Sequence, residues 1–247
     1  MPTLVQVPLV GQNLDCYTDR SWQLENGLTG RGGRAKRPLS KSQFLARMSN
    51  YCCVGTYYTR ISLQHERRML LEHGASFACK LSKICDDVLI DWIAQGGKAV
   101  VMVHRTNGFK GMCTLLNHRA KLLNAEAEGK GETDEDAPPP LHVSSYPPCL
   151  PHEQDSTPSD VLQRFNDRSN DQGGSAGVLV VDAKVAGEGV SLFSVRRLYL
   201  GDVPWSWMDY QQRVGRVVRF CSHTRLPEEE REVEVKIYTA TCPEMGK

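Results

Sequence analysis

The chain has 247 residues, of which 40% are hydrophobic and 24% are charged, and its formal net charge is +1. This size and composition suit one sizeable globular domain with appendages, or two small domains. The near-zero charge excludes binding of a polyanion by overall positive charge, so any such site must come from local clustering. No stretch approaches the roughly twenty apolar residues that span a membrane, and we expect no membrane partner.

Nine cysteines are scattered along the chain without a Cys-x-x-Cys pair. This pattern favours neither a disulfide framework nor a zinc ribbon. Cys149 and His152 have the spacing of metal ligands but lack a second pair, so we expect no metal site. The N-terminus lacks the pattern of a signal peptide. Reduced thiols in an intracellular compartment, nucleus or cytoplasm, are therefore expected.

The first 50 residues combine one expected strand with a basic segment. Residues 3–9 can form a strand, which Pro8 restricts to an edge or an end. Residues 28–42 are rich in Gly, Arg and Lys, which predicts a flexible basic loop. A solvated linker is the plainer interpretation of this loop, and contact with a phosphate backbone is the alternative.

Strand and helix patterns then alternate along the chain. Helical spacing covers residues 60–94, 109–124, 159–168 and 207–221. Apolar or alternating runs predict strands at 98–104, 141–146, 178–182, 196–201 and 232–240. The acidic stretch 126–140 ends in three prolines, and it predicts a disordered insertion extending over about 126–157. This alternation predicts an α/β fold with a largely parallel sheet and flanking helices.

The stretch YQQRVGRVVRF sets Arg216 and Arg219 three residues apart, next to Gly215. On a helix over 207–221, these arginines and Gln212 fall within roughly 60° of one another, apart from the apolar stripe. Gly215 has no side chain to block close approach. Paired guanidinium groups suit a phosphate, because each provides charged, bidentate hydrogen bonds.

A second glycine-bearing segment, AKVAGEGVS at 183–191, follows the expected strand 178–182. Ligands gather at the carboxyl ends of parallel strands. The arginine segment also follows a strand, so we expect both segments at the same edge. A solvated surface, with Glu228–Glu230 as ion-pair partners, is the alternative for the arginines. Trp205 and Trp207 are expected to pack rather than to stack on bases.

These segments resemble the C-terminal RecA-like lobe of superfamily 2 helicases and nucleic-acid-dependent ATPases. Residues 212–219, QRVGRVVR, match the family's last motif, Q-x-x-G-R-x-x-R, at every defined position. Residues 178–192 resemble the preceding motif, which is a strand, a turn of small residues and Gly-x-Gly. Swi2/Snf2-like ATPases and poxvirus or giant-virus NTPases share further features, represented here by Glu188–Leu192, Pro204–Trp205 and Ser222–Pro227.

The resemblance covers about residues 75–240 and implies the domain organisation. Residues 51–247 would form the RecA-like second lobe, of the P-loop NTPase type. Residues 1–50 would be an N-terminal extension, comprising a crossover strand and a basic linker that come from a first lobe.

The resemblance also implies catalytic roles. Arg216 and Arg219 would be arginine fingers that reach the γ-phosphate of ATP held by the other lobe, and Gln212 would help to orient the site. Arginines in such positions neutralise charge that develops during phosphoryl transfer. ATP and Mg²⁺ would be the cofactors of the complete two-lobed enzyme.

Other residues would bind phosphate or couple the binding of ATP to that of nucleic acid. Gly187 and Gly189, like Gly215, would allow close approach to the phosphates. Glu188 and Ser191 would link the nucleotide cleft to the nucleic-acid track. Many relatives have Asn or Asp at the position of Ser191.

Two family features are missing from the chain. Gly97-Lys98 and Gly129-Lys130 are not followed by Ser or Thr, so neither is a phosphate-binding loop. The letters Asp134-Glu135 fall in the acidic insertion, without a preceding apolar strand. We therefore predict a C-terminal lobe that is inactive alone and acts on DNA or RNA with a first lobe, in cis or in trans. The alternative is a non-catalytic interaction module that retains the fold, and a small-molecule enzyme is a weaker third.

Overall fold

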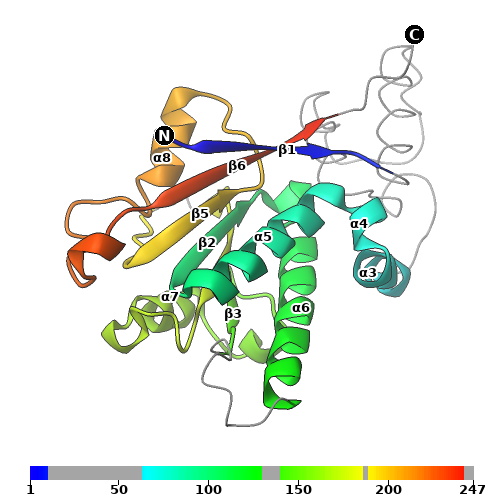
Figure 1. Cartoon of the computed structure of the whole chain (residues 1–247), viewed down its shortest axis with the longest axis horizontal. Coiled ribbons are helices and arrows are strands. Elements are labelled where there is room, and N and C mark those ends of the chain that lie inside the picture. The colour runs from blue at the N-terminus through cyan, green and yellow to red at the C-terminus, as the bar shows by residue number, and fades with distance from the viewer. Residues whose placement is uncertain (11–62, 130–139, 186–188, 242–247) are drawn as a thin grey trace.

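Six parallel strands form one sheet in the order β1-β6-β5-β2-β4-β3 (Figure 1). The computed structural model describes residues 1–10, 63–129, 140–185 and 189–241. The strands are β1 (Thr3–Pro8), β2 (Lys98–Val103), β3 (Val143–Tyr146), β4 (Val178–Asp182), β5 (Val195–Leu200) and β6 (Glu234–Thr241). The predicted α/β fold with a largely parallel sheet is confirmed.

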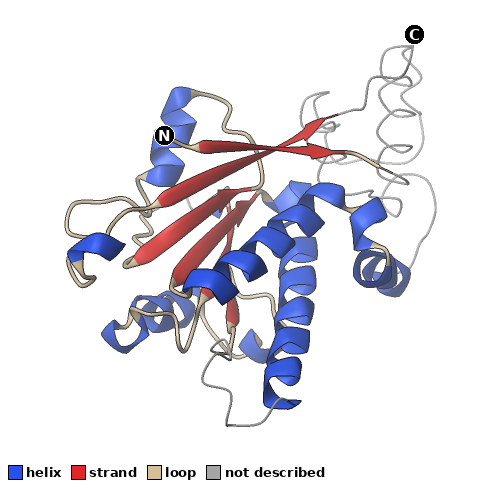
Figure 2. Cartoon of the chain, in the orientation of Figure 1, coloured by secondary structure: helices blue, strands red, loops and turns tan. Residues whose placement is uncertain are grey.

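Helices cover both faces of the sheet (Figure 2). They are α3 (Leu63–Glu72), α4 (Gly74–Phe77), α5 (Cys79–Gln95), α6 (Phe109–Gly129), α7 (Pro158–Asn166) and α8 (Trp207–Val214). The helical pattern predicted over 60–94 thus corresponds to three successive helices within the described residues. None of the helices described here is long and apolar enough to span a membrane.

Alternate residues of the central strands build two hydrophobic cores. Val101 and Tyr199 pack with α5 and α6 on the near face in Figure 1, whereas Val100 and Leu198 pack with α7 on the opposite face. Side chains alternate in this way because successive residues of a strand point to opposite faces. All residues of β2 and β4 are buried, as the continuous apolar runs predicted.

β1 lies at the edge of the sheet and pairs in parallel with β6. Pro8 is its last residue, which confirms the prediction that this proline would restrict the strand to an edge or an end. The first and last described strands are therefore neighbours. The predicted basic loop 28–42 lies outside the described residues.

The bounds predicted for the disordered insertion, 126–157, are too wide. Helix α6 continues to Gly129, and β3 pairs with β4 as an edge strand of the sheet. The proline-rich loop after β3 is held by Glu153, whose buried carboxylate accepts a hydrogen bond from Ser145 N at 2.8 Å. Such contacts fix a segment whose sequence shows only a weak helix or strand pattern. Residues 130–139, the remainder of the predicted insertion, lie outside the described part of the chain.

Lys98 begins β2 and is completely buried. Its Nζ donates to Phe165 O at 2.5 Å and lies 4.3 Å from the centre of the Phe165 ring. Burial lowers the pKa of Lys98 from 10.5 to about 8. The unfolded chain therefore binds more protons than the folded chain between these two pH values, and Lys98 makes stability rise with pH there.

We predict that Lys98→Met flattens this rise. Phe165 O keeps a second donor, Asn170 Nδ2 at 3.0 Å, so the substitution leaves no buried carbonyl unpaired. The increase in unfolding free energy between pH 7 and 10 should be smaller in the variant by about 1–3 kcal/mol. Urea denaturation across this range measures it, with exposed Lys121→Met as control. Equal slopes in wild type and Lys98→Met would contradict the assignment.

Candidate functional site

The glycine-bearing segment after β4 and the arginine segment after α8 lie side by side. Leu192 N donates to Arg216 O at 3.0 Å. The Arg219 guanidinium donates from Nη1 to Ser191 Oγ at 2.5 Å. The prediction that these two segments come together is confirmed, and we call Ser191, Gly215, Arg216 and Arg219 the arginine site.

The arginine site lies near the start of β5 rather than at the carboxyl edge of the sheet. Ser194 N donates to Ser222 O at 2.9 Å, and His223 Nε2 donates to the carbonyl of Val195, the first residue of β5, at 2.7 Å. The predicted edge is therefore wrong. The chain leaves β4 at its carboxyl end and must return to the start of β5, which runs parallel to β4 on the other side of β2. The later residues of this connection consequently lie near the strand starts.

Helix α8 ends at Val214 rather than at Cys221. Arg216 and Arg219 therefore lie on the turns that follow, not on a common helical face with Gln212. The hydroxyl of Ser222 accepts a hydrogen bond from Arg219 N at 3.0 Å, and Cys221 has a φ of 63°. Side-chain bonds of this kind compete with the helical ladder. The sequence spacing could not reveal them.

The three arginines of this segment have different surroundings. Arg213 is buried and forms two hydrogen bonds with Asp209, from Nε at 2.9 Å and from Nη2 at 2.8 Å. Its Nη1 also donates to Asp202 O at 3.1 Å, so this arginine braces α8 against the end of β5. Arg216 is half-buried.

Arg219 is exposed, and its contacts are with neutral groups. Besides the Ser191 hydroxyl, its Nε donates to Gly215 O at 2.9 Å. Among residues 1–10, 63–129, 140–185 and 189–241, it forms no ion pair; Glu230 instead pairs with Arg196. The alternative prediction is a solvated surface with Glu228–Glu230 as ion-pair partners. Arg219 is solvent-exposed, as that alternative expects, but it forms no ion pair with these glutamates. Gln212 is exposed on α8.

Gly189, in the glycine-bearing segment, and Gly215, in the arginine site, each have a stereochemical reason to be glycine. Gly189 is exposed and has a φ of 66°, a left-handed conformation that other residues adopt at a cost. At Gly215, a Cβ would lie 2.8 Å from the Gln211 carbonyl oxygen, so a side chain would disturb the end of α8. Gly187 and Glu188, predicted as phosphate-binding and coupling residues, lie outside the described residues.

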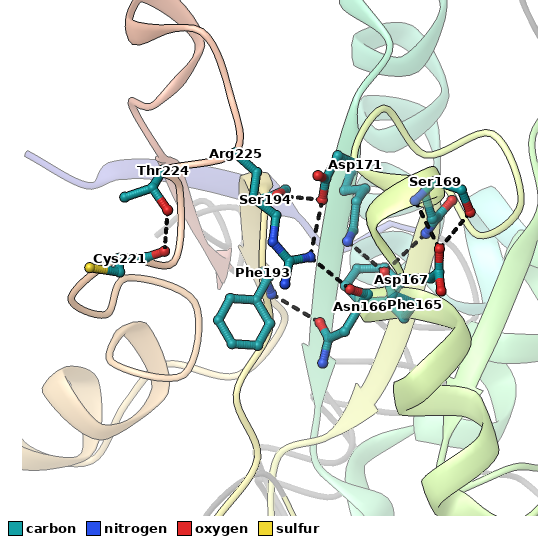
Figure 3. A network of polar contacts seen from close by, with 12 residues as sticks. Phe165, Asn166, Asp167, Ser169, Asp171, Phe193, Ser194, Cys221, Thr224 and Arg225 are labelled. Carbon is teal, nitrogen blue, oxygen red and sulfur yellow. Dashed lines mark hydrogen bonds and ion pairs between the residues drawn. The ribbon is translucent and has the colours of Figure 1, made fainter.

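Asn166, the last residue of α7, holds the glycine-bearing segment in place. Its Nδ2 donates to Ser191 O at 2.8 Å, and its Oδ1 accepts from Phe193 N at 3.0 Å. Figure 3 shows the amide of Asn166 facing Phe193, within a network that includes Arg225 and Asp171. Sequence reasoning missed Asn166, because a single asparagine at a helix end carries no distinctive pattern.

We predict that Asn166→Ala destabilises the chain by about 1–3 kcal/mol, because Ser191 O and Phe193 N each lose a partner. Urea denaturation measures the loss. Asn117→Ala is a matched control, since Asn117 is partly buried on α6 and alanine favours the helix. A loss in Asn166→Ala no larger than in the control would show that the amide does not hold the segment.

The carboxyl edge of the sheet has a separate polar cluster. The loop after β2 is held by a carboxylate from each neighbouring strand. Asp182 accepts from Arg105 N at 3.0 Å and from Arg105 Nε at 2.9 Å. Asp202 accepts from His104 N at 2.7 Å and from Asn107 Nδ2 at 2.8 Å. Both aspartates are buried, and each fixes the loop after the central strand.

Lys80 adds a buried positive charge near Asp202. Burial lowers the pKa of Lys80 to about 8, and the Asp202 carboxylate opposes this shift. The Lys80 ammonium near the start of α5 and the Asp202 carboxylate after β5 therefore stabilise each other's charged forms. Neither aspartate is among the site residues predicted from the sequence, because a single aspartate at or after a strand end carries no distinctive pattern.

Lys98, which follows Gly97, is not placed as the lysine of a phosphate-binding loop would be. The Lys98 amine is buried against Phe165, as described above. Across the same residues, no group of three or more His, Cys, Asp or Glu side chains could hold a metal ion. The described residues thus present arginines without a nucleotide-loading loop or a metal site.

Exposed apolar side chains precede and follow the arginine segment along the chain. Trp205, Trp207 and Met208 are each more than 60% exposed, and Phe220 is 98% exposed. The Trp207 ring stacks on Tyr210, with ring centres 5.1 Å apart. Trp205 and Trp207 are predicted to pack rather than to stack on bases, but both are largely exposed at the start of α8, and within the described residues only Trp207 stacks on another ring. A group of exposed apolar side chains is typical of a surface that binds another protein, domain or ligand.

Comparison with known proteins matches the part of the chain that carries the arginine site. Residues 142–221 match the family model of the helicase conserved C-terminal domain. The chain is 36% identical over 84 residues to a protein of Acanthamoeba polyphaga mimivirus that is named as an ATP-dependent RNA helicase, covering 34% of this chain and 10% of that protein. It is 33% identical over 87 residues to nucleoside triphosphatase I of Melanoplus sanguinipes entomopoxvirus, covering 35% and 13%. The matches thus span about a tenth of the relatives' length.

Two solved structures share the fold. The C-terminal part of the Fun30 ATPase domain aligns with a TM-score of 0.55 and 8% identity, over 99% of this chain and 85% of that one. The SWI2/SNF2 ATPase core domain of Sulfolobus solfataricus aligns with a TM-score of 0.55 and 14% identity, over 98% and 40%. At these identities the likeness concerns the fold alone.

Proposed function

We propose that the chain is the second lobe of a nucleic-acid-dependent ATPase of superfamily 2, because residues 142–221 match the family model of the helicase conserved C-terminal domain. In this proposal, Arg216 and Arg219 complete a site for ATP that a first RecA-like lobe binds. The whole activity needs both lobes, and this chain alone hydrolyses nothing.

The observation that supports this role most strongly is the state of Arg219. It is an exposed cation held by the Ser191 hydroxyl and the Gly215 carbonyl, both neutral. A neutral partner orients the guanidinium without cancelling its charge. The same group can then exchange these contacts for charge-assisted hydrogen bonds to a phosphate, which are about twice as strong as neutral ones.

The surrounding residues would position the arginines. Arg213 braces α8 through Asp209, and Asn166 fixes the backbone on both sides of Leu192. Because Leu192 N is bonded to Arg216 O, these two supports meet at the arginine site. A rigid support matters because small misplacements of charged groups cost much of their effect on a transition state.

The first lobe would supply the remaining chemistry. It would contribute the lysine of a phosphate-binding loop and the acidic ligands of Mg²⁺, for which the described residues offer no site. The metal would neutralise phosphate charge from that side. The exposed side chains Trp205, Trp207 and Phe220 would lie against the first lobe or the nucleic-acid track.

The test is an ATP hydrolysis assay of the complete two-lobed protein, with single-stranded DNA, double-stranded DNA or RNA, beside this chain alone. We expect the complete protein to hydrolyse ATP faster with at least one nucleic acid, and the chain alone to be inactive. Nucleic-acid binding without hydrolysis by the complete protein would instead favour a non-catalytic interaction module. Hydrolysis by this chain alone would contradict the proposal.

A further inference from the structure

A cavity of about 460 Å³ lies beside β3, the strand at one edge of the sheet. Both α6 and α7 contact β3 (Figure 1), and residues of all three elements line the cavity. Small-molecule sites in proteins commonly have volumes of about 300–1,000 Å³. The cavity is therefore large enough for a small ligand, and it shares no residue with the arginine site.

The lining of this cavity is basic. Lys121 comes from α6 and Arg164 from α7, and His142 and His152 lie in the same lining. None of the described residues that line the cavity is Asp or Glu. Two positive charges on separate helices, with no carboxylate in the lining, favour an anionic ligand.

Glu153 is the counter-charge of Arg164, but other groups already satisfy its carboxylate. This buried carboxylate accepts hydrogen bonds from Ser145 N at 2.8 Å and from Leu150 N at 3.3 Å, and also from the Ser145 hydroxyl. Arg164 Nη2 lies 3.8 Å from Glu153 Oε1, which is beyond hydrogen-bond distance. Because the Arg164 side chain is 41% exposed, its guanidinium keeps donors for a ligand in the cavity.

The cavity also contains neutral groups without partners. Ser144 is 3% exposed, yet its hydroxyl forms no hydrogen bond within residues 1–10, 63–129, 140–185 and 189–241. Asn117 is partly buried in the same lining, and its amide has no hydrogen-bond partner in that part of the chain either. Buried polar groups in folded proteins almost always have a partner. The unpaired hydroxyl of Ser144 therefore indicates a polar ligand.

We propose that this cavity binds a small phosphate monoester. Its phosphate lies between Lys121 and Arg164 and accepts hydrogen bonds from the Ser144 hydroxyl and the Asn117 amide. A phosphate monoester has three terminal acceptor oxygens and nearly two negative charges at neutral pH. It therefore matches two cations and several donors better than a carboxylate, which has two oxygens and one charge. The planar fork of an arginine suits bidentate contact with such a group.

The remainder of the lining suits the organic part of the ligand. Ala120 and Leu141 are both buried core residues that also border the cavity, so they provide an apolar surface beside the basic side chains. Ligand sites typically combine such a surface with a few polar groups that fix orientation. A compact sugar phosphate fits this combination.

The experiment titrates the purified, isotope-labelled chain with ribose 5-phosphate and follows its backbone amide signals by NMR. Ribose is the matched uncharged probe, and inorganic phosphate is the probe without an organic part. We expect ribose 5-phosphate to shift the signals around Ser144 and Asn117 with a Kd below about 1 mM. Ribose should shift none of them, and inorganic phosphate should bind there more weakly. Equal affinity for inorganic phosphate would overturn the assignment to an ester.

Variants test whether these residues form the site. Lys121→Met and Ser144→Ala should each weaken binding of ribose 5-phosphate about tenfold, the effect of one lost hydrogen bond to a charged group. Lys110→Met removes an exposed lysine of the same helix that does not line the cavity, and it should leave the Kd unchanged. Arg219→Ala should also leave it unchanged, which separates this site from the arginine site.

Three results would overturn the proposal. An equal loss of affinity in Lys110→Met and Lys121→Met would show general attraction to a basic surface. Signal shifts around Arg219 instead of Ser144 would place the ligand in the arginine site. Shifts around Ser144 that a single-stranded oligonucleotide causes and ribose 5-phosphate does not would assign these residues to nucleic-acid binding.

Discussion

Replacing Arg219 with alanine in the complete two-lobed protein should lower kcat for nucleic-acid-stimulated ATP hydrolysis by about 10³–10⁵-fold, the effect of an arginine finger. The guanidinium would act on charge that develops in the transition state, so KM for ATP should change much less than kcat. Because Arg219 is exposed and bonds only to Ser191 and Gly215 with its side chain, the fold should survive. Steady-state kinetics measure both constants.

Two further variants sharpen this test. Arg219→Lys keeps a positive charge but loses the planar fork, so it should recover a small part of the rate. Arg231→Ala removes another exposed arginine, whose Nε bonds to Leu226 O, and it should hydrolyse ATP at close to the wild-type rate. A wild-type kcat in Arg219→Ala would remove the basis for assigning the finger.

Asp202→Ala should destabilise the chain by about 3–5 kcal/mol, the usual cost of removing one partner of a buried charge pair. The substitution leaves His104 N and Asn107 Nδ2 without their acceptor and leaves the buried Lys80 ammonium without its counter-charge. Asp202 also raises the pKa of Lys80, so the variant should have a still lower Lys80 pKa. Urea denaturation at pH 7 measures the loss.

The pH dependence separates the charge effect from the lost hydrogen bonds. Above its folded-state pKa, Lys80 is neutral and no longer needs a counter-charge, so the loss in Asp202→Ala should be smaller at pH 10 than at pH 7. Asp155→Ala, at an exposed aspartate, should change stability by less than about 0.5 kcal/mol. A loss of stability in Asp202→Ala below about 1 kcal/mol would contradict the role of Asp202 in holding the loop after β2 and the Lys80 charge.

Most strands could be predicted because their apolar runs are local. KAVVMV at 98–103 and VLVVD at 178–182 are buried on both faces, and continuous apolar residues report this directly. β3 at 143–146 was expected as a strand but assigned to the insertion. The prolines that follow it are typical of a loop. The contact that holds this region joins Glu153 to Ser145, eight residues away, and no local pattern reports it.

The candidate site was less accessible to sequence reasoning. The spacing of Gly215, Arg216 and Arg219 indicated a phosphate-directed segment, and the structure brings it to Ser191 as expected. Hydrogen bonds between side chains and backbone groups place the site near the start of β5. Such bonds also end α8 early and let Asn166 support the glycine-bearing segment. Such bonds leave no periodic trace in a sequence.

The central claim is that the arginine site meets the phosphates of a nucleotide bound by another lobe. The most direct measurement is a crystal structure of the complete two-lobed protein with ADP, Mg²⁺ and aluminium fluoride, which mimics the transferred phosphoryl group. We predict a guanidinium nitrogen of Arg219 within about 2.7–2.9 Å of the mimic, with Arg216 beside it. A closed complex in which both arginines point away from the nucleotide would contradict the claim.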